Sequence, residues 1–229
     1  ISPDGSRFAS GGWDRRIQLG ALPTTETETE TETDSDPNTA SIEAPLVLSG
    51  HLNMINALAF SPNGRWLASV DGDRVRPDDS RGQLRIWDTA LGELAAVHDF
   101  DGPVMALAVA GDGRSLAVTG SPPCGLILFE NPWPGESSMT PRRSFLSNGD
   151  RNGWGVAYAP DGRWLAHATG NGVVELWNLD QPGDAPAHTL TIGPPYGEAL
   201  AVGFDPTGRV LALAQGNGLL RVLDWPPEP

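Results

Sequence analysis

The stretch SGHLNMINALAFSPNGRWLAS at residues 49–69, with LRIWD at 84–88, decides the fold of this chain. It contains a short SPNG turn between two apolar runs. Short apolar runs bounded by glycine, asparagine, aspartate and proline are typical of β-strands joined by tight turns. The turn and the run that follows it occur five times: SPDGSRFAS at 2–10, SPNGRWLAS at 61–69, AGDGRSLAV at 110–118, APDGRWLAH at 159–167 and DPTGRVLAL at 205–213.

The chain is therefore built from repeats, and their turn glycines stand 59, 49, 49 and 46 residues apart. Many of the strands are apolar on both faces, as expected when each sheet is buried between two neighbours. We find no helical periodicity and predict an all-β fold. The third predicted strands of the repeats are RIQL at 16–19, QLRIW at 83–87, GLILF at 125–129, VVELW at 173–177 and LLRVL at 219–223.

The second repeat resembles a WD40 repeat, since Gly50-His51 matches the GH pair of that family and Trp87-Asp88 matches its WD pair. Trp177-Asn178 is a weaker match to the WD pair. The resemblance implies a β-propeller with one four-stranded blade per repeat. We expect one WD40 β-propeller domain over residues 1–229, with about five such blades. The chain starts at a repeat turn and ends after a third strand, so we expect an incomplete part of a six- or seven-bladed ring.

The resemblance also implies a hydrogen-bond network of histidine, serine or threonine, aspartate and tryptophan within a blade. His51, Ser69 and Trp87 match three of these positions, but Arg81 stands where the aspartate is expected. We therefore predict that no repeat has the complete network. Counting from the turn glycine places Glu130 at the tryptophan position of the third repeat. We expect structural roles for Gly50, His51, Ser69, Trp87, Asp88, Trp177 and Asn178.

The charge is strongly acidic, with a formal net charge of −14, and all 15 basic residues are arginine. Such a surface repels phosphates, so neither nucleic acid nor an anionic membrane is an expected partner. Half of the net charge lies in residues 24–44, which alternate threonine with glutamate. We predict that residues 23–44 form a disordered acidic loop within the first blade. The single cysteine, Cys124, favours a reducing compartment, and we expect a cytoplasmic protein.

The candidate partner-binding site combines tryptophans and arginines, the residue types that dominate interface hot spots. In WD40 propellers the loops that carry them here lie on one face. The long loop at 70–82 is read as a decorated surface loop or as a partner contact; its aspartates match no calcium loop. The site residues are Trp13, Arg15, Arg16, Arg74, Arg76, Arg81, Arg151, Trp154 and Tyr196.

Catalytic patterns are absent from the sequence. The four histidines fall in different repeats without metal-ligand spacing, and no GxSxG motif occurs. We expect no catalytic residue, cofactor, metal or small-molecule substrate. The leading hypothesis is a protein-protein interaction scaffold that binds proteins or peptides. The alternative is the sensory or substrate-gating propeller of a larger multidomain enzyme such as a kinase, nucleotide hydrolase or peptidase.

Overall fold

The computed structural model describes residues 1–22, 44–73, 81–135, 139, 141–145, 152–181, 183, 185–192 and 198–225. Within these ranges every regular element is a β-strand, so the predicted all-β fold is confirmed. No helix in this part of the chain is long and apolar enough to cross a membrane. The segment predicted to be disordered, 23–44, lies outside the described residues apart from Ala44.

The strands form five antiparallel sheets, A to E, and each sheet follows the order of the chain. Sheet A contains β1 (Arg7–Gly11), β2 (Arg16–Ala21) and β3 (Leu46–Ser49). Sheet B contains β4 (Ile55–Phe60), β5 (Trp66–Asp71), β6 (Gly82–Asp88) and β7 (Glu93–Phe100). Sheet C contains β8 (Val104–Val109), β9 (Ser115–Gly120), β10 (Leu126–Glu130) and β11 (Pro141–Phe145). Sheet D contains β12 (Gly153–Tyr158), β13 (Trp164–Thr169), β14 (Val173–Asn178) and β15 (His188–Thr191), and sheet E contains β16 (Ala199–Phe204), β17 (Val210–Gln215) and β18 (Leu220–Asp224).

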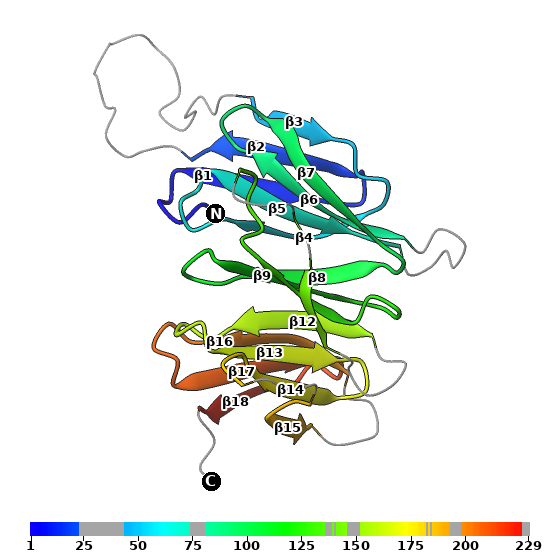
Figure 1. Cartoon of the computed structure of the whole chain (residues 1–229), viewed down its shortest axis with the longest axis vertical. Coiled ribbons are helices and arrows are strands. Elements are labelled where there is room, and N and C mark those ends of the chain that lie inside the picture. Colours follow the sequence, from blue (N-terminus) through cyan, green and yellow to red (C-terminus); the bar gives the residue numbers. More distant parts are fainter. Residues whose placement is uncertain are drawn as a thin grey trace, which may run out of the picture.

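The five sheets are stacked in chain order, with sheets A and E at the two ends of the stack (Figure 1). Sheets B to E meet along their first strands, which we call the inner strands: β4 contacts β8, β8 contacts β12 and β12 contacts β16. Sheets B, C and D have four strands each, and the described parts of A and E have three. This arrangement confirms the predicted propeller-type blades.

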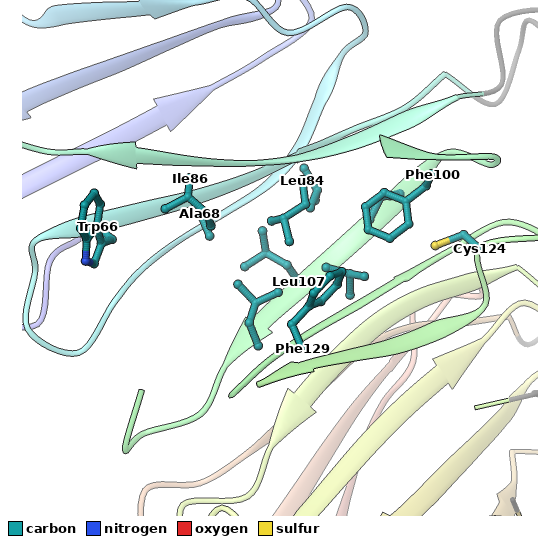
Figure 2. Close-up of a cluster of buried hydrophobic side chains, with 12 residues drawn as sticks. Trp66, Ala68, Leu84, Ile86, Phe100, Leu107, Cys124 and Phe129 are labelled. Carbon is teal, nitrogen blue, oxygen red and sulfur yellow. The ribbon is translucent and has the colours of Figure 1, made fainter. Parts of the chain in front are cut away.

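The core lies between the sheets and follows the two-residue period of the strands. In β5, Leu67 packs toward sheet A while Ala68 packs toward sheet C. Figure 2 shows the cluster between sheets B and C, where Leu84 and Phe129 are fully buried. Burying one such side chain stabilises a fold by about 1.5–3 kcal/mol. The sheets therefore hold one another together through their apolar faces.

The conformation of the turn glycine explains why this residue occurs in every repeat. Gly5, Gly64, Gly113, Gly162 and Gly208 all have φ between 67° and 73°. This left-handed conformation is costly for residues with a Cβ and costs glycine nothing. In sheets B to E the turn links the inner strand to the second strand, and in sheet A it precedes β1.

The strand register confirms most of the predicted alignment and corrects one position. Trp87 lies opposite Leu67, and Trp177 lies opposite Leu165. In sheet C the residue opposite Leu116 is Phe129, so the prediction of Glu130 at the tryptophan position was wrong. The β9–β10 loop has one residue more than the β13–β14 loop, because Thr119 pairs with Leu126 whereas Ala168 pairs with Val174.

Candidate functional site on the upper face

The described members of the predicted partner-binding set lie at one end of the stack, which we call the upper face. It is the end at which the inner strands begin, and it includes the β1–β2 turn and the β5–β6, β9–β10, β13–β14 and β17–β18 loops. Trp13, Arg15, Arg16, Arg81 and Trp154 are described and lie on these segments. The other members of the predicted set, Arg74, Arg76, Arg151 and Tyr196, lie outside the described residues.

A buried polar network joins sheet B to the upper face. His51 Nε2 lies 2.6 Å from Ser69 Oγ, which also accepts a hydrogen bond from Trp87 Nε1 at 2.8 Å. His51 Nδ1 lies 2.9 Å from Asp71 Oδ2. The second repeat therefore has the complete network, and the prediction that Arg81 replaces its aspartate was wrong. The carboxylate comes from the end of β5, not from the residue that precedes β6, because β5 carries Asp71 up to the loop that holds His51.

Asp71 also fixes the loop that leads into β4. Its carboxylate accepts hydrogen bonds from the backbone amides of Leu52 and Asn53, each at 3.1 Å, and of Gln83 at 2.6 Å. A buried carboxylate is stable only when donors surround it, and Asp71 is 0% exposed. The network consequently sets the position of residues 51–53 on the upper face.

The Ser69–His51–Asp71 arrangement resembles a nucleophile activated by a histidine and a carboxylate. Ser69 is 0% exposed, and its oxygen already contacts His51 and Trp87. A nucleophile needs space beside it for a substrate carbonyl and for oxyanion donors. The arrangement is therefore a structural network in this fold.

The WD pair and its weaker counterpart stabilise equivalent turns. Asp88 Oδ1 accepts hydrogen bonds from the amides of Ala90 and Leu91 at 2.9 and 3.1 Å. Asn178 Oδ1 accepts one from the amide of Asp180 at 3.0 Å. Trp177 is 1% exposed and packs on Phe145 of sheet C, with ring centroids 4.5 Å apart. Gly50 has φ 130° and lies against the Arg85 guanidinium, so a Cβ there would meet Nη1 at 2.5 Å.

Trp13 is the most exposed large apolar side chain described, at 85%. It lies on a turn with a fixed backbone: the Arg15 amide donates to Gly12 O at 3.1 Å, and Arg15 has φ 65°. The Ile55 amide donates to the same oxygen at 3.2 Å. A large aromatic side chain on a rigid turn loses little conformational freedom on binding, which is typical of an interface anchor.

The structure brings part of the predicted set together. The bond between Ile55 and Gly12 joins the Trp13 turn to the loop that carries Leu52, which is 64% exposed. Asn53 Nδ2 in that loop donates to Arg81 O at 2.8 Å. We call this group the A–B patch, and it consists of Trp13, Arg15, Arg16, Leu52 and Arg81. Trp154 belongs to sheet D and lies beyond sheet C from this patch.

The site predicted from the sequence did not include four upper-face residues, Leu52, Asn56, Met105 and Leu200. Each of β4, β8, β12 and β16 has a register irregularity at its second residue, which is skipped in the Cα pairing with the next strand. Bulges of this kind re-aim a side chain and are common beside functional sites. The signal in the sequence is position, since each of these residues stands eight before its turn glycine. They are Asn56, Met105, Trp154 and Leu200.

Other candidate sites in the described residues offer less chemistry. A groove of about 570 Å³ lies between the lower ends of sheets C and D. Several of its charges are engaged: Arg142 pairs with Glu130, and Arg143 donates to the carbonyl of Gln181 at 3.4 Å. Burial raises the pKa of the Cys124 thiol to about 12, so it is protonated and unreactive at neutral pH. Within the described ranges no group of three or more His, Cys, Asp or Glu side chains is arranged to hold a metal.

Comparison with known families agrees with this geometry. The profile described as "WD domain, G-beta repeat" matches residues 1–19, 43–88 and 142–178. These ranges include strands of sheets A, B and D, whereas β8–β10 and sheet E lie outside them yet have the same strand order. Stacked antiparallel blades with an Asp71–His51–Ser69–Trp87 network define a propeller-type repeat protein. The chain contains WD40 repeats in these three ranges.

Parts of the chain are similar to three curated proteins. The chain is 26% identical over 102 residues to Protein HIR1 of Eremothecium gossypii, which covers 44% of this chain and 11% of HIR1. It is 28% identical over 126 residues to the target of rapamycin complex subunit wat1 of Schizosaccharomyces pombe, covering 52% of this chain and 38% of wat1. It is 42% identical over 48 residues to the pre-mRNA-splicing factor prp46 of Emericella nidulans, covering 21% of this chain and 9% of prp46. The matched part thus spans well under half of each relative.

Proposed function

We propose that this chain is a protein-interaction scaffold that binds proteins or peptides through its upper face and performs no chemistry of its own. The observation that carries the proposal is Trp13, an 85% exposed tryptophan held on a turn with a fixed backbone. Exposed aromatic side chains that are grouped with arginine and leucine are typical of interface centres. In the A–B patch the leucine is Leu52 and the arginines are Arg15, Arg16 and Arg81.

The WD40 repeats support the same function. One similar protein, wat1, is by name a subunit of a complex, and prp46 is by name a splicing factor. The buried state of Ser69 and the protonated Cys124 leave the two nucleophile candidates without access or activation. The net charge of −14 opposes binding to nucleic acid.

A comparison of three variants, two in the A–B patch and one control outside it, tests this proposal. Trp13→Ala and Leu52→Ala alter the A–B patch, and Leu91→Ala removes a 68% exposed leucine at the lower end of sheet B. Tagged wild-type and variant proteins are expressed in the source cells, and bound proteins are quantified by mass spectrometry. We expect bound partners to fall about tenfold or more with Trp13→Ala, the loss typical of a hot-spot residue, and to stay constant with Leu91→Ala.

Equal capture by wild type and Trp13→Ala would contradict the role of the A–B patch. If the wild-type chain captured no partner protein, the scaffold function itself would be contradicted. Urea unfolding of each variant is the control, since Trp13 is exposed and its removal is expected to leave stability unchanged.

A further inference from the structure

The contact between sheets B and C contains a histidine near its upper end. His98 lies on β7, the last strand of sheet B, and its side chain is partly buried. Its ring packs edge-to-face against Phe100 of the same strand and against Phe129 of sheet C, with ring centroids 4.8 and 5.1 Å away. The ring centroids of Phe100 and Phe129 are 6.2 Å apart. These three side chains, which we call the His98 contact, therefore join β7 to sheet C.

The His98 contact is continuous with the apolar core between the two sheets. Phe100 and Phe129 belong to the buried cluster drawn in Figure 2, together with Cys124. Leu84, directly opposite His98 in the β6–β7 pairing, belongs to the same cluster and is 0% exposed. His98 therefore lies at the edge of an apolar region, where an ionised group costs free energy unless a partner compensates its charge.

On β7 itself, the charged group closest to His98 is the carboxylate of Asp99. Successive side chains of a strand point to opposite faces, so Asp99 points away from the His98 contact. Its Oδ1 accepts a hydrogen bond from Gln83 Nε2 at 2.7 Å. Asp101 lies in the loop after the end of β7. Asp99 thus influences His98 through its charge without pairing with it in the contact.

The other charged groups on the described parts of sheets B and C lie elsewhere. Asp71 pairs with His51, and Arg85 lies against Gly50, both in the loop that comes from sheet A. On sheet C, the charged residues of β10 and β11 line the groove toward sheet D, on the opposite face from His98; they are Glu130, Arg142 and Arg143. Five further charged residues lie at the lower ends of the two sheets: Arg65, Asp88, Glu93, Asp112 and Arg114. None of these groups is placed to compensate an imidazolium of His98.

Burial lowers the pKa of the His98 imidazole below its usual 6.5, and the negative charge of Asp99 opposes part of this shift. The folded protein therefore favours the neutral imidazole, which packs on Phe100 and Phe129 as an aromatic ring. Because the folded pKa lies below 6.5, the stabilisation is fully present above pH 6.5 and is lost as the pH falls toward the folded pKa.

We propose that His98 makes the contact between sheets B and C sensitive to protons, so that its protonation weakens the attachment of β7 to sheet C. The neutral ring contributes aromatic packing, whereas the imidazolium brings a charge to the edge of the apolar cluster. This proposal concerns how two sheets are held together, and it does not depend on the scaffold function.

Cys124 reports on the opening of this contact, because it belongs to the same cluster and is 7% exposed. Its reaction with dithiodipyridine, a reagent that labels thiols in acid as well, is measured at about pH 8 and about pH 5. Each rate is divided by the rate of the urea-unfolded chain at the same pH, which removes the pH dependence of the thiol chemistry. We expect the corrected rate of the wild type to rise about threefold or more on acidification. In His98→Phe, which keeps an aromatic ring without a titratable group, we expect it to stay constant.

An NMR titration of His98 in the folded chain gives a second measurement that needs no folded variant of His98. We expect its midpoint below 6.5. Asp99→Asn is expected to lower the midpoint further, because it removes the negative charge that favours the imidazolium. Glu93→Gln, an exposed carboxylate at the other end of β7, is the matched control and is expected to leave the midpoint unchanged.

A His98 midpoint at or above 6.5 would overturn the proposal. An equal rise of the corrected Cys124 rate in the wild type and in His98→Phe would also overturn it, since the acid sensitivity would then belong to another group. Neither result bears on the scaffold function, which is tested separately by the dependence of partner capture on Trp13.

Discussion

The hydroxyl oxygen of Thr119 lies 2.7 Å from Nε2 of His167, and this contact joins two neighbouring sheets. Thr119 belongs to β9 of sheet C and His167 to β13 of sheet D, and both are 0% exposed. On its other side His167 Nδ1 lies 3.2 Å from Glu175 Oε2 in β14. Most of the interface between these sheets is apolar, so a directional polar contact fixes how they are aligned.

Thr119→Val tests this contact. Valine has the shape of threonine without the hydroxyl, so the change leaves Nε2 of His167 buried without that partner. We expect the free energy of unfolding to fall by about 1–3 kcal/mol, measured by urea denaturation. Thr189→Val, on the exposed strand β15, is the matched control and is expected to change it by less than about 0.5 kcal/mol. Equal effects of the two variants would contradict the role of the inter-sheet bond.

The Gly153→Ala variant is expected to crowd the contact between Thr119 and His167. A Cβ on Gly153 would lie 1.8 Å from Thr119 Oγ1 and 2.5 Å from His167 Nε2. Since neither buried group can move far, we expect destabilisation of about 1–3 kcal/mol in thermal or urea unfolding. Gly203→Ala on the next inner strand has no atom within 4 Å of its added Cβ and serves as the control. The double variant Gly153→Ala with Thr119→Ala should cost less than the sum of its parts.

The Asp71→Asn variant tests whether Asp71, rather than the residue at position 81, has the aspartate role in the network. The asparagine keeps one carbonyl oxygen for the donors that now surround the carboxylate, and it places an amide group beside them. We expect a loss of about 3 kcal/mol in the free energy of unfolding. Arg81→Ala, an exposed residue in front of β6, is expected to change stability by less than about 0.5 kcal/mol. A larger loss for Arg81→Ala than for Asp71→Asn would refute our assignment of the carboxylate.

Acid should weaken the turn that precedes β17. The hydroxyl of Thr207 and three backbone amides donate to Asp205 and lower the pKa of its carboxyl from 3.8 to about 2. Because the folded pKa is below the unfolded one, the stabilisation is present above pH 3.8 and is lost as the pH falls toward 2. An NMR titration of the Asp205 carboxyl measures this directly, and a midpoint near 3.8 would contradict it.

We expect the thiol of Cys124 to be unreactive in the native protein. Its burial raises its pKa to about 12, and the side chain is 7% exposed within the B–C cluster. We expect a thiol reagent such as DTNB to react with it only after unfolding in urea. Rapid reaction at neutral pH in the absence of denaturant would show that the B–C cluster opens readily.

Much of the fold was predictable because it depends on local signals. A glycine with φ near 70° ends each of the five repeated turns, after Pro-Asp, Pro-Asn, Gly-Asp or Pro-Thr, and short apolar runs mark the strands. The register of sheet C was misjudged at Glu130, because the number of residues in the β9–β10 loop does not follow from strand patterns. The site was predicted in part: the Trp13 turn and Arg81 are both hydrogen-bonded to residues 53–55, whereas Trp154 lies on sheet D.

The sequence by itself determined the all-β repeat architecture, the hairpin turns and the exposed tryptophan of the first repeat. These features depend on the residues within one repeat, where φ preferences and two-residue periodicity act over a few positions. Only the tertiary structure decided that Asp71 completes the network of sheet B, that Thr119 meets His167, and that one bulge recurs in four inner strands. Each of these depends on how strands from different parts of the chain are brought side by side, and that placement is set by packing between sheets rather than by distance along the chain.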